Sequence, residues 1–285
     1  MTTATVSQSG LRRDLFGLQR VPFTAAAPCY LDPARADLLA KASAFLQRRG
    51  FAFLGGPPGA GKTRLLQHVC SLPDPRSVQL AYLPFAMCRD RELLRALALA
   101  FRLETPYRKS ALLRLLQEHA LSLGAAITPI LVIDEAQLLD AAALDTLRVL
   151  ANHTFESQNL FAIFLVGHDE FRERLSLRVH EPLRQRLAAC WHLAAFDREH
   201  TLAYVEHHLR HAGAEHALFA PEALHRLYDQ TRGVPRLINH LALAALEAAS
   251  ARTSPTVTLA DLDTASDTLP DTQPRETTNH APRPA

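Results

Sequence analysis

The residues with the most specific chemistry form one continuous run, in which glycines and prolines precede a lysine and a threonine. The run, 56–63, fits the phosphate-binding pattern G-x-x-x-x-G-K-[ST] at every fixed position. Backbone N–H groups of such a loop approach anionic oxygens, the lysine reaches the β- and γ-phosphates, and the threonine hydroxyl binds Mg²⁺. We therefore predict that ATP and Mg²⁺ bind here. The residues expected at the nucleotide are Gly56, Pro57, Pro58, Gly59, Ala60, Gly61, Lys62, Thr63 and Arg64.

A plain Gly/Pro turn is the alternative to a phosphate-binding loop. The flanking sequence disfavours it, because an apolar run (51–54) enters the loop and a helical pattern that starts at Leu65 leaves it. Only three of the 31 basic residues are lysines, so a lysine in the loop does not follow from composition.

Two acidic residues follow another apolar run. The run 130–133 ends at Asp134 and Glu135, so both carboxylates should lie at the carboxyl edge of a sheet, beside the phosphate-binding loop. We predict that Thr63 and Asp134 bind Mg²⁺, and that Glu135 orients and polarises the attacking water. The alternative is a pair of acids that caps the following helix.

Four further polar residues are candidates for contact with the phosphates. His168 follows the next apolar run and is the candidate for contact with the γ-phosphate or the attacking water, although a strand-terminal His is often an ordinary loop residue. Arg184 and Arg186 precede the last strand, where a guanidinium could reach a nucleotide bound to a neighbouring subunit; ordinary surface arginines are the alternative. Arg236 lies in the first turn of a helix, where a cation opposes the dipole, and the nucleotide phosphate is the expected anionic partner.

Alternating strand-like and helical segments position these residues. The strand-like runs are 51–54, 78–83, 130–133, 161–166 and 191–195. Continuous apolar runs are typical of strands buried on both faces, which predicts an α/β fold with a mainly parallel, five-stranded sheet under helices. After residue 197 three helical patterns follow, 201–211, 221–230 and 235–251, and they predict a second, all-helical unit.

The two ends of the chain differ in composition from the rest. They are rich in small and polar residues and poor in large apolar ones, so we expect them to be tails. The predicted division is a disordered N-terminal tail (1–12), a nucleotide-binding core (13–197), a helical lid (198–267) and a disordered C-terminal tail (268–285).

The composition excludes several classes of protein. The 285 residues are 48% hydrophobic and 21% charged, as in a soluble globular protein. No apolar run approaches the ~18 residues of a membrane helix, and the N-terminus lacks a signal-peptide pattern. We expect a cytoplasmic protein with no membrane contact. The four scattered cysteines are expected to be reduced thiols, and the run 206–211, which contains three histidines, is expected to be a solvated helix face rather than a metal site.

Several segments resemble one family in the same order along the chain. They are Phe16-Gly17-Leu18 with Pro22-Phe23, Asp134-Glu135-Ala136-Gln137, Leu165-Val166-Gly167 and Gly233-Val234-Pro235-Arg236-Leu237-Ile238-Asn239. Together with the phosphate-binding loop they resemble the AAA+ ATPases, and more closely the ExeA-type ATPases and the related TniB and TnsC transposition regulators. The resemblance extends over about residues 12–265.

This resemblance implies a three-layer αβα core whose five-stranded parallel sheet has the order 5-1-4-3-2, followed by a C-terminal all-helical lid. It also implies an adenine pocket formed partly by the N-terminal segment and the lid, and ATP-dependent homo-oligomerisation. The role of an arginine finger in trans would fall to Arg184 and Arg186 as a pair. His168 departs from the family, which commonly carries glutamine there, and this leaves γ-phosphate sensing and the rate of hydrolysis open.

The likeness to transposition regulators implies a helper that oligomerises on double-stranded DNA with ATP and recruits or activates a DDE transposase. The stretch 89–114 carries seven basic residues against three acidic ones and could follow a phosphate backbone, although a solvated helix face is the simpler explanation. Two alternatives remain. One is an ExeA-like ATPase that assembles a secretion or envelope complex, and the other is a nucleotide-gated scaffold with little turnover.

Overall fold

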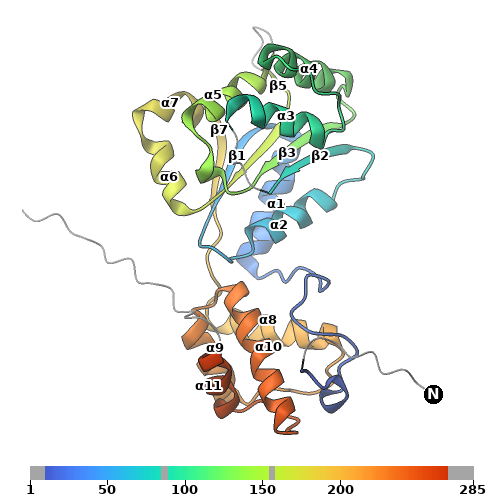
Figure 1. The fold of residues 1–285 in the computed structure, drawn as a ribbon, viewed down its shortest axis with the longest axis vertical. Coiled ribbons are helices and arrows are strands. Elements are labelled where there is room, and N and C mark those ends of the chain that lie inside the picture. Colours follow the sequence, from blue (N-terminus) through green and yellow to red (C-terminus); the bar gives the residue numbers. More distant parts are fainter. Residues whose placement is uncertain (1–9, 85–88, 154–157, 269–285) are drawn as a thin grey trace, which may run out of the picture. The chain divides into compact units, whose positions relative to one another are not determined.

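The computed structural model describes residues 10–84, 89–153 and 158–268. They form two compact units, each with its own hydrophobic core (Figure 1). The first unit contains residues 31–194. The second combines residues 10–30 with residues 195–268.

The first unit is built on a five-stranded sheet. In chain order its strands are β1 (Gly50–Gly55), β2 (Val78–Leu83), β3 (Thr128–Ile133), β6 (Ala162–Val166) and β7 (Leu187–His192). They are hydrogen-bonded in the order β2-β3-β6-β1-β7, and every neighbouring pair is parallel. This is the predicted order 5-1-4-3-2 read from the opposite edge, so the predicted fold class is confirmed.

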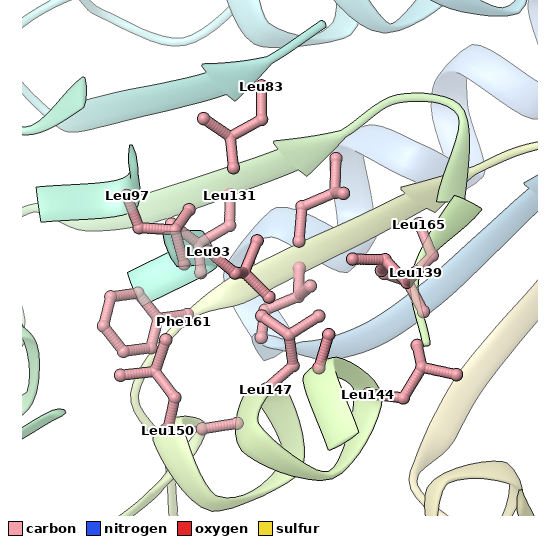
Figure 2. Close-up of a cluster of buried hydrophobic side chains, with 14 of the residues drawn as sticks. Leu83, Leu93, Leu97, Leu131, Leu139, Leu144, Leu147, Leu150, Phe161 and Leu165 are labelled. Atoms are coloured by element: carbon pink, nitrogen blue, oxygen red, sulfur yellow. The ribbon is translucent and has the colours of Figure 1, made fainter. Parts of the chain in front are cut away.

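Side chains that alternate along the strands explain why helices cover both faces of this sheet. In β1, Phe51 and Phe53 join one core cluster, whereas Ala52 and Leu54 join another. The helices of the first cluster are α3 (Asp90–Ala100), α4 (Lys109–Ser122), α5 (Ala141–Leu150), α6 (Asp169–Ser176) and α7 (Glu181–Arg184), and those of the second are α1 (Pro33–Arg48) and α2 (Lys62–Ser71). Figure 2 shows leucines of α3 and α5 gathered around Leu131 and Leu165 of the sheet.

The last strand begins earlier than its sequence predicts. The apolar pattern indicates 191–195, but β7 spans Leu187–His192. This strand lies at the edge of the sheet, and its residues alternate between half-buried and exposed. An edge strand therefore lacks the continuous apolar run that reveals the central strands. The two-residue strands β4 (Asn152–His153) and β5 (Gln158–Asn159) were not predicted, because two residues are too few to show a period.

The second unit contains four helices in its C-terminal part. They are α8 (Arg198–Ala212), α9 (Pro221–Thr231), α10 (Pro235–Ala251) and α11 (Leu259–Thr268). The sequence predicts the first three as separate patterns and misses α11, whose apolar face includes Leu262 and Ala265, both buried in the core of this unit.

The run 206–211 in α8 is not the solvated face that the sequence predicts. His208 is 6% exposed, and its ring stacks on Phe23 with 5.3 Å between the ring centroids. His207 lies 5.5 Å from the ring of Tyr30 and 3.2 Å from the carbonyl oxygen of Pro28. An aromatic cluster on one side of α8 explains these histidines, and Glu206 and Arg210 remain on the exposed side as an ion pair.

Residues 10–30 pack with the helices of the second unit, so the sequence-based division differs from the structure at this end of the chain. The backbone N–H groups of Gln19 and Arg20 donate to the carbonyl oxygen of Ala212, and Phe16 is fully buried. Leu11 is buried too, and the N–H of Arg12 donates to Ser250 Oγ at 3.0 Å. The prediction of a tail through residue 12 therefore does not hold for residues 10–12. The apolar residues here are scattered, and no regular period announces that they pack.

No helix in the part of the chain that the structure describes combines the length and the apolar character needed to cross a bilayer.

Candidate nucleotide-binding site

The phosphate-binding loop connects the end of β1 to the start of α2 and is pressed against the chain that follows β7. Gly56 has φ +146°, and a Cβ atom at this position would lie 2.3 Å from the carbonyl oxygen of Leu193. Only glycine fits this backbone without displacing its neighbour. Lys62 is 8% exposed, and its Nζ donates to the carbonyl oxygens of Gly56 at 2.7 Å and Pro57 at 3.0 Å. The loop therefore has a fixed backbone with a buried cation lying against it.

Two oxygen-bearing side chains meet at the edge of the loop. Thr63 lies in the first turn of α2, and its Oγ1 donates to Asp134 Oδ2 at 2.5 Å. Asp134 directly follows β3 and is 7% exposed, and its Oδ1 accepts the N–H of Glu135 at 3.0 Å. A hydroxyl and a carboxylate are the ligand types that Mg²⁺ prefers. The donor set at this position therefore fits the predicted metal.

Tyr82, near the end of β2, completes the surroundings of this carboxylate. Its hydroxyl donates to Asp134 Oδ2 at 3.3 Å. Burial, the charge and hydrogen bond of Asp134, and the charge of Glu135 raise the pKa of Tyr82 to about 12, so the hydroxyl remains a donor at neutral pH. Sequence reasoning missed Tyr82, because an aromatic residue in a strand is usually explained by packing.

Glu135 is held by a side chain two residues further along the chain. Its backbone is left-handed, with φ +52°, which turns the chain sharply after β3. Gln137 Nε2 donates to Glu135 Oε2 at 2.5 Å, and Gln137 Oε1 accepts the N–H of His168 at 3.4 Å. A Cβ atom on Gly167 would lie 2.8 Å from the same Oε1. Gln137 thus connects the end of β3 to the end of β6, a contact that its sequence position alone did not reveal.

His168 lies beside the predicted catalytic acid. The distance between its Nε2 and Glu135 Oε2 is 3.7 Å, close enough for an ion pair when the imidazole is protonated. Both side chains are partly exposed. The structure therefore brings together Glu135 and His168, which the sequence analysis had placed in the same site from the ends of two separate strands.

A buried ion pair that the sequence analysis missed is hydrogen-bonded to the backbone of the phosphate-binding loop. Asp32 caps α1, accepting the N–H of Arg35 at 2.6 Å, and its other oxygen lies 2.5 Å from Arg35 Nη1. Arg35 Nη2 donates to the carbonyl oxygens of Ala60 at 3.3 Å and Ala194 at 3.0 Å. The only available signal was Asp32-Pro33, which marks a helix start. The tertiary role of Arg35 has no local signature.

The two arginines before β7 have different surroundings. Arg184 ends α7 with a side chain that is 47% exposed; its Nη1 donates to the carbonyl oxygen of Ser176 at 3.1 Å, and its Nη2 lies 4.0 Å from Glu181 Oε1. Arg186 is half-buried, and its Nη1 donates to Asn152 Oδ1. Arg184 is the one whose guanidinium is turned to solvent. The structure thus separates two residues that the sequence could treat only as a pair.

The last two predicted residues are exposed. Arg64 follows Thr63 in the first turn of α2, and Arg236 lies in the first turn of α10, in the second unit. In the described residues there is no cluster of three or more His, Cys, Asp or Glu side chains that could hold a metal ion by themselves.

A sheet in the order β2-β3-β6-β1-β7, with a phosphate-binding loop after β1 and two acids after β3, defines a class of protein. It is the AAA+ fold, followed here by a helical C-terminal part. Residues 46–175 match the family model described as an AAA domain.

Among proteins of known name, this chain is similar to General secretion pathway protein A of Aeromonas hydrophila. The two are 34% identical over 260 residues, which cover 88% of this chain and 47% of the relative. The chain therefore spans about half the length of that relative.

Two solved structures illustrate the shared fold. Cdc6p from Pyrobaculum aerophilum has a TM-score of 0.71 and 20% sequence identity, covering 86% of this chain and 69% of its own. The ORC1 protein of Aeropyrum pernix, solved in complex with DNA, has a TM-score of 0.62 and 20% identity, covering 92% of this chain and 70% of its own. At such identities the likeness shows the fold alone.

Proposed function

We propose that this chain binds and hydrolyses ATP with Mg²⁺. The observation that carries the proposal is one connected set of contacts, in which Thr63 bonds to Asp134 and Gln137 bonds to Glu135, at the edge where the phosphate-binding loop lies. An AAA domain match over residues 46–175 supports it. These contacts, beside a lysine buried against the loop carbonyls, support a nucleotide site over a plain Gly/Pro turn.

Each residue of this set has a distinct task. Lys62 supplies positive charge at the loop, and Thr63 and Asp134 would hold Mg²⁺, which would supply positive charge to offset that of the phosphates. Glu135 accepts a hydrogen bond from the attacking water and draws its proton away. Gln137 fixes the direction in which that carboxylate points, and His168 Nε2 lies 3.7 Å from the same oxygen, Oε2.

We further propose that the chain forms ATP-dependent homo-oligomers. The exposed guanidinium of Arg184 supports this, since its few contacts with its own chain leave it able to meet a neighbouring subunit's nucleotide. Arg186 is the weaker candidate, because it is engaged with Asn152. Arg236 and Arg64 are proposed nucleotide contacts whose exposed positions in first helical turns allow them to meet an anion.

For the process that ATP hydrolysis serves, we propose the assembly of a secretion or envelope complex. The 34% identical relative named as a general secretion pathway protein favours this over the other functions considered. A cytoplasmic position of the nucleotide-binding unit fits a supply of ATP. The proposal concerns the part shared with that relative, about half of the relative's length.

DNA binding with recruitment of a transposase is the second candidate, supported by the basic stretch 89–114. Part of that charge is already offset within the chain. Lys109 pairs with Asp90, and Arg114 pairs with Glu118. Exposed pairs of this kind reduce the net field available to a phosphate backbone.

One experiment separates these functions. ATP turnover and sedimentation are measured for the wild type and for Lys62→Ala, with and without double-stranded DNA, at two salt concentrations. Turnover that Lys62→Ala abolishes and that DNA leaves unchanged would support an ATPase of secretion or envelope assembly. DNA-stimulated, salt-sensitive assembly would move the proposal to the transposition helper. ATP binding without turnover would leave only the nucleotide-gated scaffold.

A further inference from the structure

A groove outside the nucleotide site lies between the start of α4 and the surface of α5. Its volume is about 880 Å³. Its walls include Arg91 from α3, Tyr107 and Arg108 from the segment before α4, Leu113 from α4, and Ala142 and Val149 from α5. None of these residues belongs to the phosphate-binding loop or to the Asp134–Gln137 cluster. The groove is therefore a second feature with its own chemistry.

The groove combines an apolar floor with an exposed aromatic ring. Leu113 is half-buried, Ala142 is exposed, and Val149 is 43% exposed. Tyr107 is 81% exposed, yet its ring is positioned by Arg91, whose guanidinium carbon lies 4.1 Å from the ring centre. A cation held over one face leaves the other face of the ring open for contact. Apolar surface and an ordered tyrosine together are typical of protein-binding surfaces.

The rim of the groove carries more positive than negative charge. Two cation–anion pairs are internally satisfied, Lys109 with Asp90 and Arg148 with Asp145. Arg91 and Arg108 have no ion-pair partner among the residues that the structure describes, and the Nε of Arg91 is buried without a hydrogen-bond acceptor.

The N-terminus of α4 adds to this surplus of positive charge. Arg108 stands at the N-cap position and makes no side-chain capping bond, so the positive end of a 14-residue helix opens toward the groove. The groove therefore offers two guanidinium groups and a helix N-terminus to an anionic group, beside an apolar surface.

We propose that this groove binds an acidic segment of a partner protein, with an apolar side chain on the floor and a carboxylate beside Arg91 and Arg108. Nucleic acid fits less well. The floor is apolar rather than cationic, which suits an apolar side chain and not a phosphate backbone, and the Asp145 carboxylate in the lining is paired with Arg148. The proposal adds a binding surface to the proposed ATPase and does not depend on ATP hydrolysis.

The test begins with selection of displayed random 12-residue peptides against the full chain. The expected result is enrichment of peptides in which Asp or Glu adjoins Leu, Ile or Phe. Enriched peptides are then labelled with fluorescein and titrated by fluorescence polarisation, next to copies with Asn and Gln in place of the acids and a 12-nucleotide oligo-dT.

Three variants locate the site. Arg108→Gln is expected to weaken the acidic peptide about tenfold, the effect of losing one charge-assisted hydrogen bond, and Ala142→Gln, which adds bulk without charge, to block the floor with similar or larger loss. Arg114→Gln is the matched control, because Arg114 is an exposed arginine of α4 that pairs with Glu118 and does not line the groove. ATP turnover and thermal unfolding of the variants report that each one is folded.

Three results would overturn the proposal. They are a selection without acidic enrichment, equal affinity for acidic and neutral peptides, and equal losses for Arg108→Gln and Arg114→Gln. Tighter binding of oligo-dT than of any peptide would assign the groove to nucleic acid instead.

Discussion

The two halves of the nucleotide site are built in different ways. The phosphate-binding half is fixed by backbone, since Gly56 is pressed against Leu193 and Lys62 is buried against loop carbonyls. The half around Glu135 is fixed by side chains, in which Gln137 and His168 hold a partly exposed carboxylate. Backbone contacts resist rearrangement, whereas a side-chain hydrogen bond can open by a rotation. On the proposed function, we therefore expect nucleotide binding to be preformed and turnover to depend on the direction of the Glu135 carboxylate.

Removing the loop lysine should have the largest effect, because it affects binding and turnover together. Lys62→Ala is expected to lower ATP turnover by about 1,000-fold and to weaken nucleotide binding, since the principal cation of the loop is lost. Steady-state turnover and calorimetric titration with ATP measure the two effects. Lys41→Ala is the control, because Lys41 is an exposed lysine paired with Asp37 on α1. Normal ATP binding by Lys62→Ala would mean that the loop is not the nucleotide site.

Removing the charge of Glu135 should separate the two halves. Glu135→Gln is expected to lower kcat about 100-fold while ATP affinity changes little, because the carboxylate acts on the water and not on the bound nucleotide. Pre-steady-state turnover and ATP binding are measured together. Asp140→Asn, at the N-cap of α5, is the control that tests whether the loss of any nearby carboxylate lowers kcat as much as Glu135→Gln does. A wild type that already turns over as slowly as Glu135→Gln would favour a scaffold.

Releasing the carboxylate should have an intermediate effect. Gln137→Ala is expected to lower kcat about tenfold with little change in KM, since the lost hydrogen bond to a charged group is worth ~1.5–3 kcal/mol at most. Gln137→Asn, whose side chain is shorter, should restore only a small part of the kcat that Gln137→Ala loses. Gln137→Glu should lower kcat further, because its carboxylate repels that of Glu135. Gln185→Ala, an exposed glutamine of the same unit, is the control. If Gln137→Ala lowers the thermal stability of the protein along with its kcat, Gln137 only supports the fold.

The smallest effect on turnover is expected at Tyr82, whose hydroxyl donates to Asp134. Its raised pKa, about 12, means that the folded chain keeps a proton that the unfolded chain releases above about pH 10. The stability that this proton provides is therefore present below pH 10 and is lost as pH rises toward 12. The free energy of unfolding of the wild type should fall more steeply over that range than that of Tyr82→Phe, and turnover near pH 7.5 should differ by less than about threefold. Denaturant titrations at several pH values test the first statement.

The sequence predicted what local patterns encode. Motif spacing singled out Lys62, Thr63, Asp134 and Glu135, of which the last three are in contact in the structure, and continuous apolar runs located the central strands. Residues whose roles depend on distant partners were missed. Gln137 is hydrogen-bonded to His168, Tyr82 to Asp134, and Arg35 to Ala194, and each partner is distant in the sequence. Edge strand β7 was shifted because exposure breaks its apolar pattern, and residues 10–30 were assigned to the wrong neighbour because their apolar side chains follow no period.

The buried pair of Asp32 and Arg35 has a mechanical consequence. The chain enters the first unit at residue 31 and leaves it at residue 194. Asp32 stands at the entrance, and Arg35 bonds to Ala194 at the exit and to Ala60 in the phosphate-binding loop. Both covalent connections to the second unit therefore start beside one guanidinium. The hydrogen bonds of this buried cation therefore tie the loop to both ends of the first unit, and a shift of Ala60 would have to carry Arg35 with it or break one of them.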